Sequence, residues 1–423
     1  MQYKLIILLV WIFPALCGQS TVTLKACLDS AILNHPRIND KQILENISKN
    51  SVSNYDAAWL PEISLNGQAT YQSDVIGFDV GLSVPGFEFP TAPKDQYKMY
   101  IDVRQTLYDA GKISRSRELE GIRLQSSLIR TETEIEVVKP ALVELFYTAL
   151  ALQQNLEILS ISREQLKKNL EVVHSSVKNG LALPADADLL SVEMLDIDQE
   201  IINLEEKRAA TVAILSSLTG IKLSEKDNFE ETIFLSYDTS LNRKELLLFD
   251  QNKKALAMTS ALKQTSRLPV AFAFGQLGYG NPGLNMLNDE FDSYYYVGLG
   301  LKWSIWDWNV TNREKANLMY QSELIDNQKN EFVENIERAK INQITAIRSH
   351  EGNISRYSGM LVLREGITSS YESRLREGTI RTIDYISVIN QERILRIRLN
   401  NEKILLQKAI AGYLLLTGNL NLQ

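Results

Sequence analysis

The chain repeats a set of short motifs at an almost constant distance, and this internal repeat limits the folds that it can adopt. A glycine, an aspartate six residues later and a Leu-Thr-Gly sequence all recur 198 residues downstream. The matched pairs are Gly180 with Gly378, Asp186 with Asp384, 218–220 with 416–418, and 108–109 with 306–307. A long-period repeat of this kind predicts two similar structural units in one chain.

Another pair of matched motifs, nearer the N-terminus of each copy, shows where the two copies differ in length. Leu60-Pro61 matches Leu268-Pro269 at an offset of 208 residues. The difference of ten residues must lie downstream of these motifs, in 62–107 of the first copy and 270–305 of the second. Loops tolerate insertions better than helices or strands do, so we expect a loop of variable length there.

The repeat predicts how the mature chain is divided. We expect a first structural repeat over 19–220 and a second over 246–423. Residues 221–245 between them are acidic and poorly periodic. We therefore interpret 221–245 as a linker or equatorial segment that joins the two copies.

Each copy contains a long stretch with few glycines or prolines and with apolar residues three or four positions apart. In the first copy this seam begins at Leu142, skips Arg163 and ends at Val177. Such spacing is typical of helices that pack along a heptad seam. We expect one helix over 112–178, roughly 100 Å long at 1.5 Å per residue. A second helix is expected to return along it after a turn at 179–184.

Four further segments alternate apolar and polar residues with a period of two, as β-strands do. They lie at about 61–75, 97–108, 268–280 and 294–306. A sheet that covers a water-soluble core is one interpretation. Membrane strands are the other, because the segments are about the 9–11 residues that cross a bilayer.

Aromatic residues at the ends of these strands favour the membrane interpretation. Tryptophan and tyrosine collect at both interfaces of membrane barrels. The cluster expected at one interface consists of Trp59, Tyr108, Trp303, Trp306 and Trp308. The alternation then assigns the two faces: Ile101 and Leu299 are expected to face lipid. The residues expected to face the lumen are Lys98, Asp102, Arg104 and Lys302.

The number of strands predicts an oligomer. Four strands cannot close a barrel, and a sheet edge with unpaired backbone groups is not stable in lipid. The missing strands must therefore come from other copies of the chain. Three copies would supply twelve strands, although the arithmetic alone allows other multiples of four.

The first eighteen residues have the pattern of a secretory signal peptide. Lys4 is followed by a short apolar stretch and by small residues up to Gly18. Cys17 would also suit a lipoprotein, but Leu16 stands where a lipidation signal requires Gly, Ala or Ser. We expect 1–18 to be removed, with lipidation of Cys17 as the alternative.

The composition excludes several classes of protein. The mean hydropathy of −0.15 is too low for a bundle of membrane helices. The formal net charge of −7 argues against nucleic acid as a partner. The three histidines lack zinc-site spacing, and Cys27 alone cannot form an intrachain disulfide. The GxGxxG sequence at 278–283 leads into a strand instead of a helix, so we expect no catalytic, metal or cofactor site.

The chain resembles the TolC-type outer-membrane efflux proteins over essentially all of the mature sequence. The order of several weak motifs carries this resemblance: 31–36, 59–61, 105–112, the two turn glycines and the two Leu-Thr-Gly sequences. The resemblance implies an α+β fold with long coiled-coil helices forming an α-barrel. It also implies a four-strand contribution to a trimeric, 12-stranded transmembrane β-barrel. In one respect the chain departs from the family, because 306–309 reads Trp-Asp-Trp-Asn where a Gly-rich turn is usual.

The resemblance also implies a function and a location. It implies a homotrimeric exit duct in the cell outer membrane, in contact with outer-membrane lipid, with helices projecting into the periplasm. Such ducts serve tripartite efflux or type I secretion systems together with a periplasmic adaptor protein and an inner-membrane transporter. They are passive, and the pump sets their selectivity. The alternatives are a periplasmic coiled-coil adaptor or scaffold, which would not explain the four strands, and an exported enzyme, which would lack any recognisable catalytic group.

The resemblance points to three residues at the ends of the helical hairpins. Carboxylates matching Asp384 form a ring that narrows the periplasmic mouth in the family, and the next ring position corresponds to Ser387. Asp186 occupies the equivalent place in the first copy. Both aspartates also suit a simpler role, because carboxylates near a helix N-terminus accept backbone hydrogen bonds. Capping and gating both remain open for Asp384, and capping is the expected role of Asp186.

Overall fold

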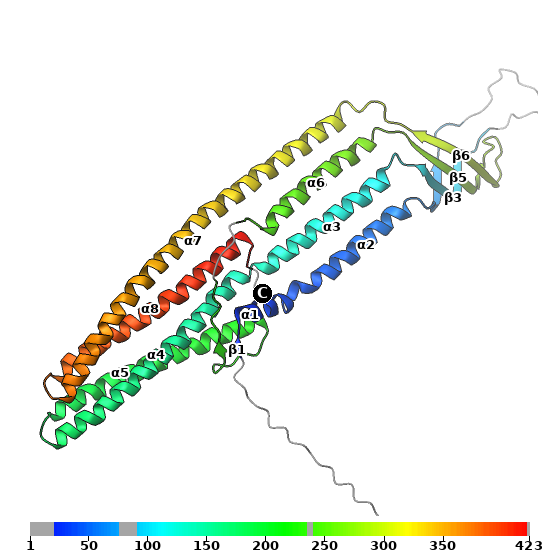
Figure 1. The fold of residues 1–423 in the computed structure, drawn as a ribbon. Helices are drawn as coiled ribbons and strands as arrows, with labels where there is room; N and C mark the ends of the chain where they lie inside the picture. The colour runs from blue at the N-terminus through cyan, green and yellow to red at the C-terminus, as the bar shows by residue number, and fades with distance from the viewer. Residues whose placement is uncertain (1–20, 76–90, 235–239, 421–423) are drawn as a thin grey trace, which may run out of the picture. The chain divides into compact units, whose positions relative to one another are not determined.

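The computed structural model describes residues 21–75, 91–234 and 240–420 (Figure 1). The expected signal peptide with Cys17 lies outside the described residues, and so do residues 76–90, within the range where a loop of variable length is expected. The chain forms two compact units, each assembled from separate segments. Unit 1 comprises 1–38, 134–243 and 333–423, and unit 2 comprises 39–133 and 244–332. Each unit therefore draws segments from both sequence repeats.

The secondary structure repeats with the same offset as the motifs. In the first copy α3 (Lys112–Glu136) and α4 (Lys139–Lys178) are followed by α5 (Pro184–Thr219). In the second copy α7 (Val310–Arg376) and α8 (Thr382–Thr417) occupy the equivalent positions, 198 residues later. The long helix and the returning helix are thus present twice.

The long helix of the first copy is not continuous, contrary to the expectation from its periodicity. It is interrupted at residues 137–138, directly before Pro140. A proline has no backbone N–H to donate and its ring collides with the carbonyl four residues earlier, here that of Glu136. The second copy has no proline in α7, and this helix runs unbroken for 67 residues.

Short elements of unit 1 build a hydrophobic core around α4. These are β1 (Thr21–Val22), α1 (Leu24–Leu33) and β4 (Asn228–Phe229), with β1 and β4 paired in parallel. The 3-10 turn η1 (Pro36–Asn39) follows α1 and has no buried residue. Phe229 is buried against the edge of Phe146, with ring centroids 5.7 Å apart. The segment 221–245, interpreted above as a linker or equatorial segment, therefore contributes to the core.

Cys27 lies inside the same core of unit 1. Its thiol is free and fully buried, and burial raises its pKa to about 11. A thiol with so little thiolate at neutral pH is a poor nucleophile. Cys27 therefore acts as a small apolar side chain.

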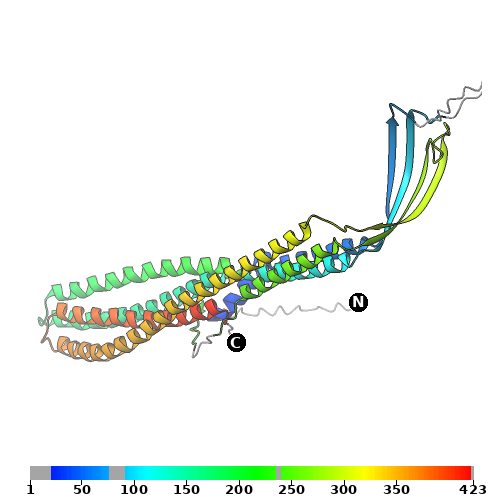
Figure 2. The ribbon, with the colours of Figure 1, turned by 90° about the horizontal axis from the view of Figure 1, so that it is seen from above.

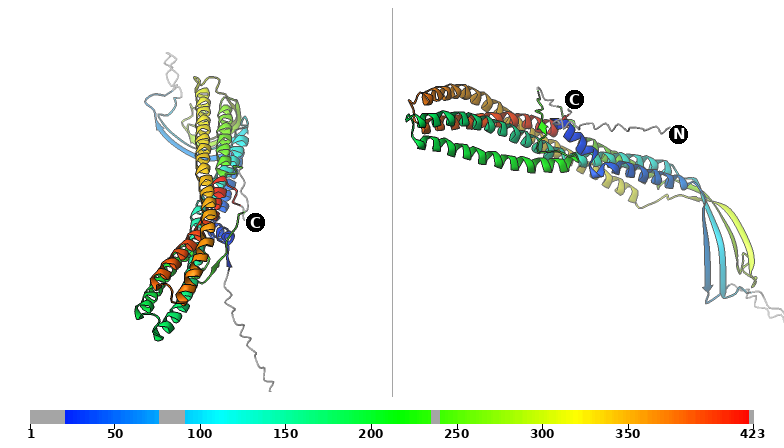
Figure 3. Two further views of the ribbon diagram at one scale, coloured as in Figure 1. Left: turned by 60° about the vertical axis from the view of Figure 1, so that its left-hand side comes forward. Right: turned by 90° about the horizontal axis from the view of Figure 1, so that it is seen from below.

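A second hydrophobic cluster of unit 1 follows the predicted heptad seam. Leu159, Leu166 and Val173 of α4 pack with Leu190 of α5 and Tyr385 of α8. The seam is buried because α5 and α8 both lie along α4, as Figure 3 shows. Packing of this kind explains the spacing of three or four residues that the sequence displays.

Unit 2 holds its helices together in another way. It contains α2 (Asp40–Ala57), α6 (Lys244–Thr265), nearly all of α3 and the first part of α7. Among the described residues, the three hydrophobic clusters all belong to unit 1. In unit 2, α6 and α7 are joined by two ion pairs of 2.7 Å, Lys253–Asp326 and Asp250–Lys329. Helices with so little apolar contact need further partners to form a stable layer.

Glu132 of α3 is placed between two lysines from other helices. Its carboxylate contacts Lys41 of α2 at 2.7 Å and Lys244 of α6 at 3.0 Å. Partial burial favours the neutral acid, but the hydrogen bonds and charges of both lysines outweigh it and lower the pKa of Glu132 below its usual 4.5. Glu132 thus ties three helices together.

We expect the Glu132→Gln variant to be less stable than the parent by about 1 kcal/mol at neutral pH. Because the folded state lowers the carboxyl pKa, this contribution is complete above about pH 5 and is lost as the pH falls below 4.5. Denaturant unfolding of the detergent-solubilised protein at pH 7 and at pH 3.5 measures the difference. A destabilisation that is equally large at both pH values would contradict the role of the charge.

Unit 2 also contains a four-stranded antiparallel sheet (Figure 2). Its strands are β2 (Glu62–Tyr71), β3 (Asp95–Tyr108), β5 (Val270–Asn281) and β6 (Asp292–Lys302), in the order β2-β3-β5-β6. The expected α+β class, with long helices and four strands, is confirmed. Strand β6 ends four residues before the predicted position 306. Within the described ranges, no helix has both the length and the apolar character needed to cross a membrane.

An aspartate lies between each of the strands β3 and β6 and the long helix that follows it. Asp109 accepts hydrogen bonds from the backbone N–H groups of Gly111 and Ile113, at 2.9 and 2.6 Å. Asp307, 198 residues later, accepts in the same way from Asn309 and Thr311, at 3.0 Å each. These bonds satisfy donors at the start of the helix, which explains why the aspartate occurs in both copies.

The two turns that lead from a strand into a long helix share an unusual backbone conformation. Ala110 and Gly111 have φ angles of +57° and +77°, and the corresponding Trp308 and Asn309 have +51° and +64°. A left-handed conformation costs a bulky residue roughly 1–2 kcal/mol. The second copy therefore keeps the turn of the first without its glycine.

Candidate functional site: the two-faced sheet and the hairpin ends

One face of the sheet is apolar and exposed on all four strands. Opposite residues of antiparallel strands point to the same side, so Leu65, Ile101 and Leu277 form one row across β2, β3 and β5. The exposed fractions are 70% for Leu65, 40% for Ile101 and 79% for Leu299. Monomeric soluble proteins rarely leave so large an apolar patch in water, which indicates a surface that another phase or partner covers.

The opposite face of the sheet is mainly polar on β2 and β3. Lys98, Asp102 and Arg104 alternate with Met99, Ile101 and Val103 and therefore share this second face. Lys302 of β6 belongs to it as well, because it alternates with Leu301 of the apolar face. The four residues expected to line a lumen thus lie on one side of the sheet.

The polar face also contains aromatic residues that the alternation pattern did not assign to it. Phe274 is paired with Arg104 on one side and with Gly298 on the other. Phe272 occupies the same position one row away, opposite Thr106 and Gly300. The register thus places both phenylalanines on the polar face and Ala271, Ala273 and Gly275 on the apolar face.

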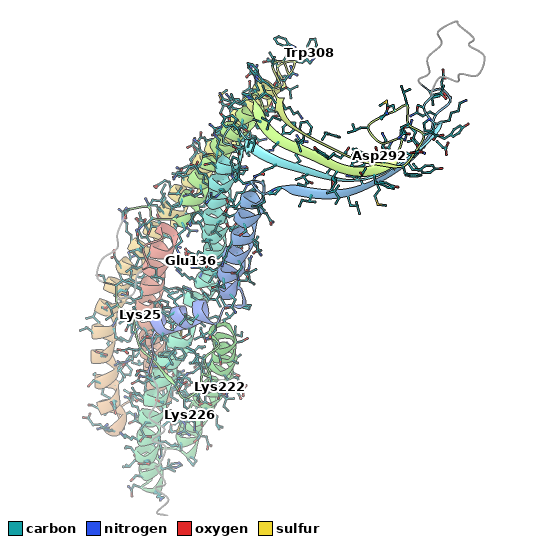
Figure 4. The ribbon with its side chains drawn as sticks, turned by 90° about the vertical axis from the view of Figure 1, so that its right-hand side faces the viewer. Lys25, Glu136, Lys222, Lys226, Asp292 and Trp308 are labelled. Atoms are coloured by element: carbon teal, nitrogen blue, oxygen red, sulfur yellow. The ribbon has the colours of Figure 1, made fainter. Side chains whose placement is uncertain are left out.

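The predicted interface aromatics gather where the strands meet the helices. The rings of Trp306 and Trp308 pack edge to face with centroids 6.0 Å apart. Trp303 donates from its indole nitrogen to the carbonyl oxygen of Arg267 at 3.1 Å. All five residues of the cluster are exposed, including Trp59 and Tyr108. Figure 4 shows Trp308 pointing away from the ribbon, and Asp292 at the other end of β6.

A β-bulge decides the direction of Tyr108. The register of β3 against β5 shifts between Thr106 and Tyr108, so Tyr108 is paired with Ala271. Ala271 belongs to the apolar face. Simple alternation from Asp102 would have placed Tyr108 on the polar face, and the bulge turns it toward the side where an interfacial aromatic belongs.

At the far ends of the helices in unit 1, two tight turns connect α4 to α5 and α7 to α8 (Figure 3). Gly180 and Gly378 have φ angles of +71° and +69°, which explains the glycine in both copies. Asp186 accepts a hydrogen bond from the backbone N–H of Leu183 at 3.1 Å. This contact is the one that a capping role requires.

Asp384 has a different partner. The guanidinium group of Arg381 donates to both carboxylate oxygens of Asp384 at 3.0 Å. Ser387 is exposed one turn further along α8, and its hydroxyl accepts a hydrogen bond from Gln391 at 3.4 Å. Arg381 was not among the predicted site residues, although a basic residue three positions before an acid is a visible signal for such a pair.

Tyr385 fixes the start of α8, and with it the position of Asp384. Its side chain is fully buried, and its hydroxyl accepts a hydrogen bond from the amide nitrogen of the equally buried Asn169 on α4 at 2.5 Å. Burial raises the pKa of Tyr385, so the phenol remains neutral. No group of three or more His, Cys, Asp or Glu side chains within the described residues is arranged to hold a metal ion.

Several solved structures share this arrangement of helices and strands. The outer membrane protein VceC from Vibrio cholerae matches with a TM-score of 0.65 and 14% identity, over 92% of this chain and 95% of its own. CusC matches with a TM-score of 0.68 and 9% identity, over 93% and 91%. The open state of the MtrE outer membrane channel from Neisseria gonorrhoeae matches with 0.64 and 12%, over 94% and 89%. No family model and no curated protein sequence matches the chain.

With its long helices and its two-faced sheet, the chain has the fold of these outer-membrane channel proteins. More particularly, this is the TolC-type fold, which the resemblance of the sequence motifs implied. The similar structures are of outer-membrane proteins and channels, not of enzymes.

Proposed function

We propose that the protein is a homotrimeric channel in the outer membrane of a Gram-negative bacterium, exported by its signal peptide. The main support for this proposal is the exposed apolar face of an open four-stranded sheet. Its outer strands β2 and β6 each lack a neighbour on one side in the described chain. In lipid, an unpaired backbone edge is very costly, so other copies must pair with these edges.

Three copies would close a barrel of twelve strands, which is wide enough to enclose a lumen. The apolar face would contact outer-membrane lipid, and the tryptophan cluster would lie at the interface. Lys98, Asp102, Arg104 and Lys302 would face the lumen. The helices would extend into the periplasm, where the sparse apolar packing of unit 2 would be completed by neighbouring copies.

Within a tripartite efflux or type I secretion system, the protein would be the passive exit duct. Its partners would be a periplasmic adaptor protein and an inner-membrane transporter. Because the chain would be divided into the repeats 19–220 and 246–423, each subunit of the trimer would have two equivalent helical hairpins at the periplasmic end. A periplasmic coiled-coil adaptor or scaffold is disfavoured, because it would have no use for an apolar sheet face.

We expect the detergent-solubilised protein to have the mass of a trimer and to conduct ions in a planar lipid bilayer. The mass follows from the unpaired edges of β2 and β6, and the conductance follows from a polar lumen. Light scattering combined with size-exclusion chromatography measures the mass, and single-channel recording measures the conductance. A uniform monomer that conducts, or a trimer that never conducts, would refute the proposal.

We further propose that Asp384 lines the periplasmic mouth of the closed channel. Three copies would bring three Asp384–Arg381 pairs together on the exposed side of α8. Asp186 would cap α5 and offer an acceptor to a neighbouring hairpin. With Ser387 at the next position, only one ring of carboxylates would attract cations, and each carboxylate would be partly neutralised by Arg381.

We expect the Arg381→Ala variant to bind a blocking trivalent cation more tightly and Asp384→Ala to lose this block. The first substitution leaves the carboxylates without their cationic partner, and the second removes them. Single-channel recording with the cation added on the periplasmic side tests both variants. Block that is the same in both variants as in the parent would leave Asp384 with a structural role only.

A further inference from the structure

The polar face of the sheet differs between its two halves. On β2 and β3 it consists mostly of charged and amide side chains. On β5 and β6 it carries Phe272, Phe274, Tyr294 and Tyr296. The first three each lie opposite a glycine, and Tyr296 lies opposite Gln276. Contact with water alone does not require four aromatic rings. The rings therefore indicate a further role for this half of the polar face.

The rings lie across the neighbouring strand instead of standing away from it. A Cβ atom added to Gly298 would come within 2.6 Å of Cζ of Phe274, and one added to Gly278 within 2.5 Å of Cζ of Tyr294. Phe272 covers Gly300 in the same way. The ring tips therefore fill the space above the glycines. Phe274 and Tyr296 remain partly exposed, whereas the guanidinium group of Arg104 lies over the ring of Phe272.

The rings and one guanidinium group form a continuous chain of contacts. The guanidinium carbon of Arg104 lies 4.0 Å from the ring centroid of Phe272. The centroid of Phe272 is 6.1 Å from that of Phe274, which is 6.2 Å from that of Tyr296. We refer to Phe272, Phe274 and Tyr296 together as the aromatic track.

The charges around the aromatic track favour an anion. Arg104 is exposed directly beside Phe272 and Phe274, and Lys302 follows Gly300 on the same face. The acidic groups of this face lie further from the two phenylalanines. Glu62 is on the far side of Arg104, and Asp102 is one row away, opposite Gln276. An aromatic solute with an anionic group would thus find a stacking surface and a cation side by side.

We propose that the aromatic track is a binding site for aromatic anions that pass through the channel. The proposal rests on the proposed function, because it needs the polar face to line the lumen. The solute's ring stacks on Phe274 and meets the ring of Tyr296 edge to face, because the planes of these two rings are inclined at 70° to each other. Its anionic group pairs with Arg104. Stacking on a protein aromatic is moderate in strength and accepts different planar rings, which suits a solute that must also leave the channel.

Single-channel recording with 2-naphthalenesulfonate as the probe tests the proposal. Methanesulfonate serves as the control anion, since it has the same charged group without a ring. We expect the naphthalene compound to interrupt the parent current in discrete events and methanesulfonate to cause none. In Phe274→Leu, which still fills the space over Gly298, the apparent affinity should fall about tenfold.

Two further variants separate the contributions. Arg104→Gln should weaken the block by the aromatic anion without removing it. Tyr295→Leu, which changes an aromatic residue on the opposite face of the sheet, should leave the block unchanged. Tyr296→Leu provides a second test of stacking if Phe274→Leu does not assemble.

The outcomes distinguish this inference from the proposed function. A parent protein that conducts but shows no block by 2-naphthalenesulfonate overturns the aromatic track and leaves the channel intact. Equal block in the parent, Phe274→Leu and Tyr296→Leu overturns it as well, and the rings then only fill the space above the glycines. A protein that never conducts refutes the proposed function, and the inference falls with it.

Discussion

Lysine in place of Ile101 is expected to prevent assembly of the trimer in the membrane. Ile101 lies in the middle of the exposed apolar face, between Leu65 and Leu277. A lysine on the lipid side of a barrel near the midplane costs roughly 2–4 kcal/mol, and a trimer carries the substitution three times. The amount of trimer in the outer-membrane fraction, seen on a gel without heating, measures the effect.

The neighbouring position provides the matched control. Asp102→Lys changes the next residue of the same strand, but on the polar face. We expect this variant to assemble nearly as well as the parent and to differ mainly in conductance. If both lysines blocked assembly to the same degree, the assignment of the two faces would be wrong.

Breaking the buried ion pair of unit 1 is expected to have the second large effect. Arg393 of α8 lies 3.1 Å from Glu193 of α5, and the two side chains are only 13% and 12% exposed. Arg393→Met leaves a buried carboxylate without its cation, which costs about 3 kcal/mol. Denaturant unfolding of the detergent-solubilised protein should show a clearly lower midpoint.

Two comparisons make this test specific. The pair Glu334–Arg338 on α7 is 69% and 62% exposed, so Arg338→Met should change stability by no more than about 0.5 kcal/mol. The double variant Glu193→Met with Arg393→Met should recover most of the lost stability, because neither charge is then left alone. A double variant as unstable as the single one would mean that the loss comes from packing.

The local features of the fold were predictable from particular residues. Gly180 and Gly378 marked the two tight turns, because few other residues adopt a positive φ. Alternation around Ile101 and Leu299 marked strands, and the seam from Leu142 to Val177 marked a long packed helix. Each of these signals acts over a few neighbouring residues, so the sequence displays it directly.

Other features depended on neighbours that are distant in the chain. The seam predicted one helix over 112–178, but the rigid ring of Pro140 ends α3 at Glu136. Asp384 was predicted to line the periplasmic mouth or to cap its helix, and no partner was predicted for it. In the structure Arg381 donates to both of its carboxylate oxygens. The acidic, poorly periodic segment 221–245 gave no sign of a buried residue, yet Phe229 is buried in the core of unit 1.

The sequence by itself determined the repeat, the element types and the presence of two unlike faces on the sheet, because periodicity and turn chemistry are local properties. Only the tertiary structure decided which residues each face contains. Register is set between strands, so the pairing of Arg104 with Phe274 placed the phenylalanines on the polar face. The bulge after Thr106 likewise moved Tyr108 to the apolar side. A shift of one residue exchanges the faces of a strand, and no pattern within a single strand records it.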